Sequence, residues 1–130
     1  QFQGLVRIAG ARPIVARRDY GGLIMTIKKL DAKHAAELLL TLPQWTLDAK
    51  VGAITREFVL TDFMHAFAFM TQIAISAEKH NHHPEWSNVY NKVLITWTTH
   101  DVKGLSSNDI EMARLCDQAF EGYAKAHAAT

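Results

Sequence analysis

The stretch from Glu78 to Trp86 holds most of the side chains that could carry chemistry. It reads Glu-Lys-His-Asn-His-His-Pro-Glu-Trp, and it places three of the chain's seven histidines within four residues. A further histidine, His100, is followed directly by Asp101 in a later segment. An imidazole in water titrates at about pH 6.5, so clustered histidines are suited to proton transfer near neutral pH.

The cluster alone is open to three interpretations. It could be a solvated turn, in which histidines bond the last carbonyls of a helix. It could be a metal site built from His80, His82 and His83 with Glu78, although it lacks the helical H-x-x-x-H spacing and C-x-x-C pairs of familiar zinc sites. It could also be a metal-free site for general acid–base catalysis, with Glu78 orienting a ring or binding an N–H-rich ligand edge.

The elements before the cluster are predicted from periodicity and turn residues. Asp31 is a good N-cap for a first helix, whose apolar residues recur at helical spacing until Pro43 stops it. Residues 45–48 and 53–60 have the short alternating pattern of two strands, and Gly52 lies in the turn between them.

A second helix is predicted from Thr61 or Asp62 to about Lys79, and it is apolar on two sides. The main stripe consists of Phe63, Ala66, Phe67, Met70, Ile73, Ala74 and Ala77. The second stripe consists of Met64, Ala68 and Ile75. A helix that is apolar on two sides is usually sandwiched, so in a domain this small the second side indicates contact with another subunit.

The rest of the chain predicts one long strand and a last helix. Residues 89–99 are rich in β-branched residues, and a turn or bulge at Asn91-Lys92 could split off a short strand at Val89-Tyr90. Ser106 and Asp109 form a capping arrangement for the last helix. Its predicted buried stripe is Met112, Cys116, Ala119, Phe120 and Tyr123. The element order predicts an α+β fold: a small antiparallel sheet of about four strands with three helices packed on one face.

Length and charge exclude several classes of protein. A chain of 130 residues fits one domain with a real core. The formal charge of +1 excludes a generally basic nucleic-acid binder. Cys116 is the single cysteine, so no internal disulfide is possible and a reducing compartment is expected. No apolar run approaches the length of a membrane span.

The first 24 residues differ from the remainder. We assign residues 1–24 to an N-terminal extension of unknown role and residues 25–130 to one domain. Residues 1–18 contain four arginines and no acidic residue, which weakly resembles an organellar transit peptide, although they contain no serine. They do not resemble a secretory signal, because arginine and proline interrupt every apolar run.

One multi-part pattern extends over most of the domain, roughly residues 28–121. Glu78 is followed at fixed distances by the His82-His83-Pro84 triplet, then by Tyr90, His100 and Asp109. The sequences Phe-Ala-Phe-Met from residue 67, Asn-His-His-Pro-Glu-Trp from residue 81 and Val-Tyr-Asn-Lys-Val from residue 89 accompany the pattern. Together they resemble the pterin-4a-carbinolamine dehydratases, which convert 4a-hydroxytetrahydropterin to quinonoid dihydropterin and water and thereby recycle tetrahydrobiopterin for aromatic amino acid hydroxylases.

The resemblance implies roles for individual residues. His82 and His100 would be the proton-transfer pair, one for each face of the pterin. His83 would bind and orient the substrate, and Glu78 would hold the N–H edge of the ring or tune a histidine. The pocket would be lined, partly through backbone groups, by Pro84, Thr99, Asp101 and Val102. Such chemistry needs no metal and no cofactor, since the pterin is the substrate.

Other residues receive more structural interpretations. Tyr90 is expected in the core or pocket wall, and Asp109 is expected as a helix cap. Trp86 could stack near the pterin or serve as a buried lid. His80 occupies a variable position of the pattern and is left out of catalysis. Trp45, Trp97 and Cys116 fit core patterns.

The resemblance also implies partners. Family members form dimers or tetramers, in which sheet edges join within a dimer and helices pack between dimers. Animal members also act as dimerisation cofactors of a homeodomain transcription factor, so a protein-binding module or coactivator is the alternative function. We expect a cytoplasmic protein, with nucleus or organelle possible, that binds neither nucleic acid nor membrane directly.

Overall fold

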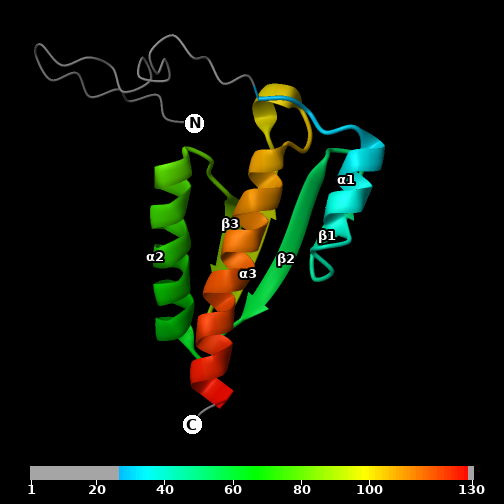
Figure 1. Cartoon of the computed structure of the whole chain (residues 1–130). Helices are drawn as coiled ribbons and strands as arrows, with labels where there is room; N and C mark the ends of the chain where they lie inside the picture. The colour runs from blue at the N-terminus through cyan, green and yellow to red at the C-terminus, as the bar shows by residue number, and fades with distance from the viewer. Residues whose placement is uncertain (1–26, 129–130) are drawn as a thin grey trace, which may run out of the picture.

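A computed structural model of the chain describes residues 27–128, so the predicted extension over residues 1–24 lies outside the described residues. Figure 1 shows the elements in chain order: α1 (Ala32–Leu39), β1 (Thr46–Asp48), β2 (Ala53–Val59), α2 (Phe63–His80), β3 (Glu85–Val89), β4 (Lys92–Trp97), the 3₁₀ turn η2 (His100–Val102) and α3 (Ser107–Ala128).

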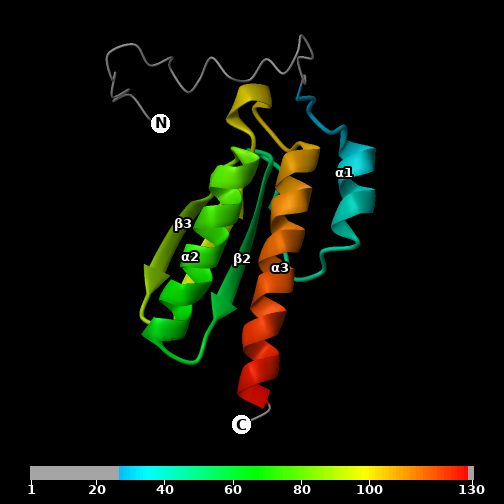
Figure 2. The ribbon, with the colours of Figure 1, turned by 60° about the vertical axis from the view of Figure 1, so that its left-hand side comes forward.

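The four strands form one antiparallel sheet in the order β1-β2-β4-β3. Helices α2 and α3 lie side by side over one face of this sheet, and α1 lies beyond α3 (Figures 1 and 2). Ala35 of α1 joins the same buried cluster as the inner residues of the sheet and of the two long helices. The predicted α+β fold is therefore confirmed.

Phe58 of β2 lies at the centre of the core and is fully buried. Its ring is 4.9 Å from Phe69 of α2, 5.2 Å from Phe120 of α3 and 5.9 Å from Trp45, measured between centroids. Tilted and edge-on aromatic contacts of this kind stabilise a core beyond the area that they bury. This cluster fixes the two long helices against the sheet.

Side-chain caps begin α1 and α2 at the predicted places, although α1 ends at Leu39, before the predicted stop at Pro43. The carboxylate of Asp31 accepts a hydrogen bond from the backbone N–H of His34 at 2.8 Å, which caps α1. Asp62 caps α2 in the same way, with the N–H of His65 at 2.8 Å. Hydrogen bonds from the backbone N–H and from the ring of His65 lower the pKa of the Asp62 carboxyl. Both predicted caps are confirmed.

The segment predicted as a strand over residues 89–99 is divided by a turn, as the predicted alternative allowed, but the turn lies at Tyr90-Asn91 and not at Asn91-Lys92. The chain forms two strands, β3 and β4, which pair antiparallel from Val89↔Lys92 outward. The turn consists of Tyr90 and Asn91, and the side-chain amide of Asn88 donates to the carbonyls of Tyr90 and Lys92. Tyr90 has a left-handed φ of 53°, which a tyrosine rarely adopts, so residue type alone did not predict that the turn begins at Tyr90.

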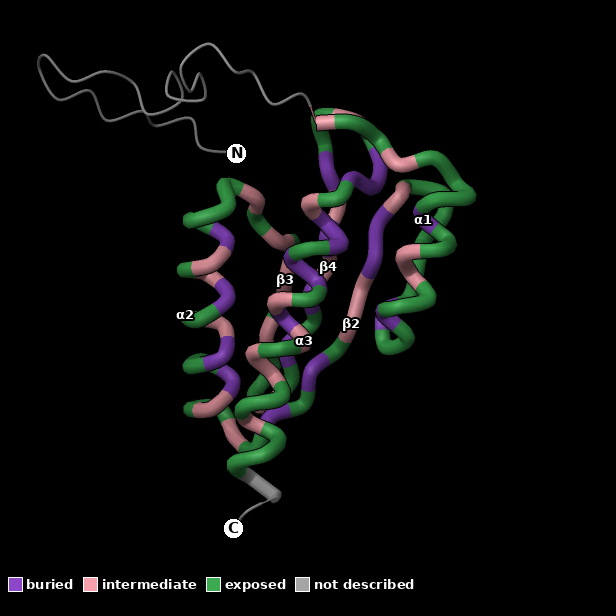
Figure 3. The backbone as a smooth tube through the Cα atoms, viewed as in Figure 1, coloured by how far each residue is buried: buried purple, intermediate pink, exposed green. Residues whose placement is uncertain are grey.

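The buried face of α2 also differs from the predicted main stripe. Its buried residues are Ala66, Phe69, Ile73 and Ala77, and in Figure 3 the buried parts of α2, in purple, lie on the side toward α3. Phe63 and Phe67, which were expected inside, are exposed by 50% and 59%. They share the outer side of the helix with Met64 and Ile75, the predicted second stripe. The helix is apolar on two sides as expected, but its inner side contains Phe69.

Candidate active site

The turn after α2 separates two adjacent histidines. Asn81 ends the helix in a left-handed conformation with φ 52°, and the backbone N–H of His82 donates to the carbonyl of Ala77 at 3.0 Å. This turn directs His82 inward, where 11% of its side chain is exposed, whereas the side chain of His83 is 55% exposed. The two neighbours therefore have different environments.

His82 is held on its edge and on its face. Its Nε2 lies 2.6 Å from Oδ1 of Asp109, which is fully buried at the start of α3. The ring also stacks on the indole of Trp97 at the end of β4, with 5.6 Å between centroids. Segments far apart in sequence thus fix both the plane and the rotation of this imidazole.

Asp109 is the centre of a buried polar network. Its Oδ2 accepts the hydroxyl of Thr99 at 2.6 Å and the backbone N–H of Ser106 at 2.9 Å. The hydroxyls of Thr99 and Ser106 are themselves 2.6 Å apart. The capping role predicted for Asp109 is confirmed, and the contact with His82 is an addition that spacing along the chain did not reveal.

The other two histidines pair with carboxylates at the surface. Nε2 of His83 lies 2.7 Å from Oε1 of Glu78, and both side chains are exposed. Nε2 of His100 lies 2.9 Å from Oε2 of Glu85, the first residue of β3. Glu85 was not singled out from the sequence, although it lies in the Asn-His-His-Pro-Glu-Trp segment. Each of the three histidines thus has its own carboxylate.

His100 lies on a loop whose backbone is closely packed. Thr99 forms an isolated β-bridge with Gly104, and Lys103 closes η2 with a left-handed φ of 53°. Gly52, in the turn between β1 and β2, approaches this loop with a φ of 69°, and a β-carbon on Gly52 would lie 2.6 Å from the Cα of Gly104. Only glycine fits there.

The remaining predicted pocket residues differ in their exposure. Pro84 and Val102 are half-buried, and Asp101 is exposed. Thr99 is 3% exposed and directs its hydroxyl toward Asp109, so it supports the site from inside. The structure brings no two of His82, His83 and His100 into a ring contact or hydrogen bond with each other within residues 27–128.

Three further residues near the histidine cluster were given structural interpretations from the sequence, and their positions can be compared with them. Trp86 is half-buried and packs against the core. Tyr90 is 62% exposed at the tip of the β3–β4 hairpin, so its expected place in the core is wrong, because its backbone forms the turn. His80 donates from Nδ1 to the carbonyl of Ser76 at 2.8 Å, one helical turn back. This bond lies within α2, and Nε2 of His80 also lies 3.8 Å from Oε2 of Glu111 on α3.

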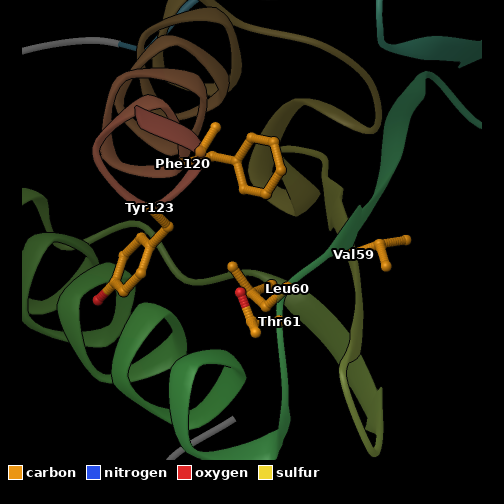
Figure 4. A pocket seen from close by; sticks show the side chains of 6 residues that line it. Val59, Leu60, Thr61, Phe120 and Tyr123 are labelled. Carbon is orange, nitrogen blue, oxygen red and sulfur yellow. The ribbon is translucent and has the colours of Figure 1, made fainter. Parts of the chain in front are cut away.

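Two cavities lie elsewhere on the molecule. One, of about 340 Å³, lies between the end of β2 and α3, with Phe120 and Tyr123 facing Leu60 and Thr61 (Figure 4). The other, of about 510 Å³, lies between α1 and α3. None of the three histidines lines either cavity. Over residues 27–128, no three His, Cys, Asp or Glu side chains are grouped in a way that could hold a metal ion.

No helix within residues 27–128 is long and apolar enough to cross a membrane.

Residues 28–119 match the family profile described as pterin 4 alpha carbinolamine dehydratase. A protein of Rhizorhabdus wittichii named "Putative pterin-4-alpha-carbinolamine dehydratase" is 50% identical over 97 residues, which cover 75% of this chain and 100% of that protein. A protein of the same name from Sinorhizobium medicae is 51% identical over 98 residues, 75% of this chain and 93% of that one.

A solved structure agrees with these sequence relatives. It is a crystal structure described as a transcriptional coactivator/pterin dehydratase from Brucella melitensis. It matches with a TM-score of 0.68 and 42% sequence identity, over 71% of this chain and 98% of that one.

Proposed function

Because the chain belongs to the pterin-4a-carbinolamine dehydratase family, we propose that it removes water from a 4a-hydroxytetrahydropterin and releases a quinonoid dihydropterin. In this reaction the C4a–O bond breaks, the N5–H proton leaves and a C4a=N5 double bond forms. The hydroxyl takes up a proton and departs as water. The reaction therefore needs one acid, one base and a surface that holds the ring in register.

The observation that carries this proposal is the pairing of His82 with Asp109. A histidine whose Nε2 bonds a fully buried carboxylate at 2.6 Å is oriented, and the imidazolium formed when it accepts a proton is stabilised. We assign His82 and His100 to proton transfer, one on each face of the pterin. With one histidine as base and the other as acid, either 4a epimer can react.

His83 and Glu78 are assigned to substrate binding. They form an exposed pair next to His82, and their polar atoms can hold the N–H-rich edge of a pterin. Pro84, Asp101 and Val102 complete the proposed lining. The proposed reaction breaks the C4a–O bond with proton transfer and without oxidation or reduction, and we propose that it involves no metal or redox cofactor. The recycling of tetrahydrobiopterin is the physiological setting that we propose.

The test is an assay of 4a-hydroxytetrahydropterin breakdown with purified wild type and single variants. His82→Ala and His100→Ala should each lower kcat by about 10²–10⁴-fold, the usual worth of a general acid or base. His80→Ala is the matched control, because His80 lies in the same cluster but contacts Ser76 and Glu111 and not the carboxylates that pair with the other three histidines. Equal rates for all four proteins would exclude histidine catalysis.

We also propose that the outer side of α2 binds a second copy of the chain. Four large apolar residues are exposed there, each by half or more: Phe63, Met64, Phe67 and Ile75. A patch of this kind in a small protein marks a protein–protein contact. The helix of another protein, as in the coactivator alternative, would be captured by the same side of α2.

A further inference from the structure

Asp109 contacts the reacting histidine but is too deeply buried to reach a substrate. Resting on the proposed function, we propose that Asp109 is a positioning residue that fixes His82 in its Nε2–H tautomer. His82 would then present Nδ1 to the pterin as the nitrogen that exchanges a proton.

The hydrogen-bond inventory around Asp109 supports this assignment. An ionised carboxylate only accepts, so the partner at Oδ1 must donate, and that partner is Nε2 of His82 at 2.6 Å. In a neutral imidazole only one nitrogen carries hydrogen, and the tautomer follows from the bond that the ring makes. With hydrogen on Nε2, the lone pair of Nδ1 is available.

The surroundings of the ring leave Nδ1 as the free nitrogen. No hydrogen bond to Nδ1 occurs among residues 27–128, in which His82 contacts Asp109 at its Nε2 edge and Trp97 on one face. The side chain keeps 11% of its surface exposed, so a ligand can still approach it. A histidine that is held by a carboxylate at one nitrogen and unbonded to residues 27–128 at the other meets the geometric need for proton transfer.

The two carboxylate oxygens of Asp109 have different partners: Oδ1 faces His82, and Oδ2 faces Thr99 and Ser106. One substitution at this residue can therefore test the inference. In Asp109→Asn, the amide must place its oxygen where Oδ2 was, because the backbone N–H of Ser106 at 2.9 Å can only donate. The amide NH₂ group then faces His82, and Nε2 must become an acceptor. The hydrogen of the neutral ring moves to Nδ1, which removes the basic site from the substrate side. An Asp-to-Asn change beside a catalytic histidine acts in this way in serine proteases.

Glu78→Gln is the matched control. It makes the same chemical change beside His83, but that pair lies at the surface, where the amide can turn either atom toward the ring. It should leave the tautomer of His82 unchanged.

The experiment is long-range ¹H–¹⁵N correlation NMR of the full chain labelled at histidine, above the pH at which the rings titrate. Nε2 of His82 should give a pyrrole-type resonance and Nδ1 a pyridine-type resonance, and Asp109→Asn should exchange them. The same variant should lower kcat by about 10²–10⁴-fold, with its far-ultraviolet circular dichroism unchanged.

A wild-type His82 with hydrogen on Nδ1 would overturn the inference, and this reading does not require the variant to fold. An Asp109→Asn protein that folds and keeps hydrogen on Nε2 would overturn it as well. A third result is possible: Asp109→Asn exchanges the two resonances, but the wild-type protein has no dehydratase activity. That result would support the tautomer assignment and contradict the proposed function. The two failures are therefore distinguishable.

Discussion

The imidazole of His82 lies almost parallel to the indole of Trp97, with an angle of 16° between the ring planes. Trp97 is fully buried, so this flat surface is fixed by the core. The core and the candidate active site therefore share a side chain, which the sequence assigned to the core alone.

Replacing Trp97 should affect catalysis according to the shape of the new side chain. Trp97→Phe keeps a flat ring beneath His82, whereas Trp97→Leu removes it. Both variants should lose stability because both leave a cavity. Trp97→Leu should also lose kcat by up to about 10²-fold, since a small misplacement of a reacting group has an effect of that size. Steady-state kinetics and urea unfolding of both variants would test this, and equal kcat values would contradict it.

Burial should decide which histidine–carboxylate pair matters for stability. Glu85→Gln breaks the pair with His100. The side chains of Glu85 and His100 are 59% and 81% exposed, so the free energy of unfolding should change by about 0.5 kcal/mol or less. Asp109→Ala leaves the Ser106 N–H and Nε2 of His82 without their acceptor and should cost about 1–3 kcal/mol for each group, whereas the Thr99 hydroxyl can still donate to Oγ of Ser106 at 2.6 Å. Urea denaturation measures both, and a similar loss in the two variants would contradict the expected difference.

The outer side of α2 should hold the oligomer together. A double variant, Met64→Asp with Ile75→Asp, places charges on this side and should reduce the mass measured by light scattering to that of a single chain. Leu40→Asp is the control, because Leu40 is 82% exposed but lies at the end of α1. An unchanged mass in the double variant would exclude this side as the interface, and loss of assembly in the control would show that the effect is not specific.

The thiol of Cys116 should be unreactive in the folded protein. Burial raises the pKa of this thiol to about 12, so almost none of it is the reactive thiolate near pH 8. A disulfide reagent that releases a coloured thiolate should therefore react slowly with native protein. In guanidinium chloride it should react at once, with one thiol per chain. Fast modification of the native protein would contradict the buried position.

Asp62 should make stability depend on pH in the acid range. Its carboxyl has a pKa below the ordinary 3.8 in the folded chain, mainly because the backbone N–H and the ring of His65 bond it. The folded state then binds this proton less readily, so the contribution is present above about pH 3.8 and is lost as the pH falls through the lowered pKa. Asp62→Asn keeps a capping oxygen without the charge.

Urea midpoints of wild type and Asp62→Asn should therefore differ at neutral pH and converge in acid. Glu37→Gln, which neutralises an exposed carboxylate on α1, controls for the loss of one negative charge. A difference that stays constant over the whole pH range would contradict the role of the Asp62 charge.

Local rules predicted the parts of the fold that local chemistry determines. The caps at Asp31 and Asp62 and the arrangement of Ser106 with Asp109 depend on residues a few positions apart, and all of them are present. The family pattern predicted which histidines to consider. Its fixed spacing narrowed the three interpretations of the cluster to one expectation.

What sequence reasoning missed depends on contacts between distant segments. Periodicity fits either apolar side of α2, so it could not show that Phe69, and not Phe63 or Phe67, packs against the sheet. The bond between His82 and Asp109 spans 27 positions and forms only when α3 packs beside the end of α2. The turn was expected at Asn91-Lys92, and its actual start at Tyr90 goes with hydrogen bonds from the Asn88 side chain that turn propensities do not describe.

The contact between Gly52 and Gly104 has a consequence for anyone redesigning this protein. The loop that carries His100 meets the turn between β1 and β2 backbone to backbone at Gly104 and Gly52, where any side chain on Gly52 would clash. A library of core variants could therefore adjust the position of His82 through Trp97, whereas a substitution at Gly52 would push against the loop of His100. An insertion into the turn between β1 and β2 would displace Gly52 and therefore the loop that carries His100. This turn is a poor site for a tag or a grafted segment.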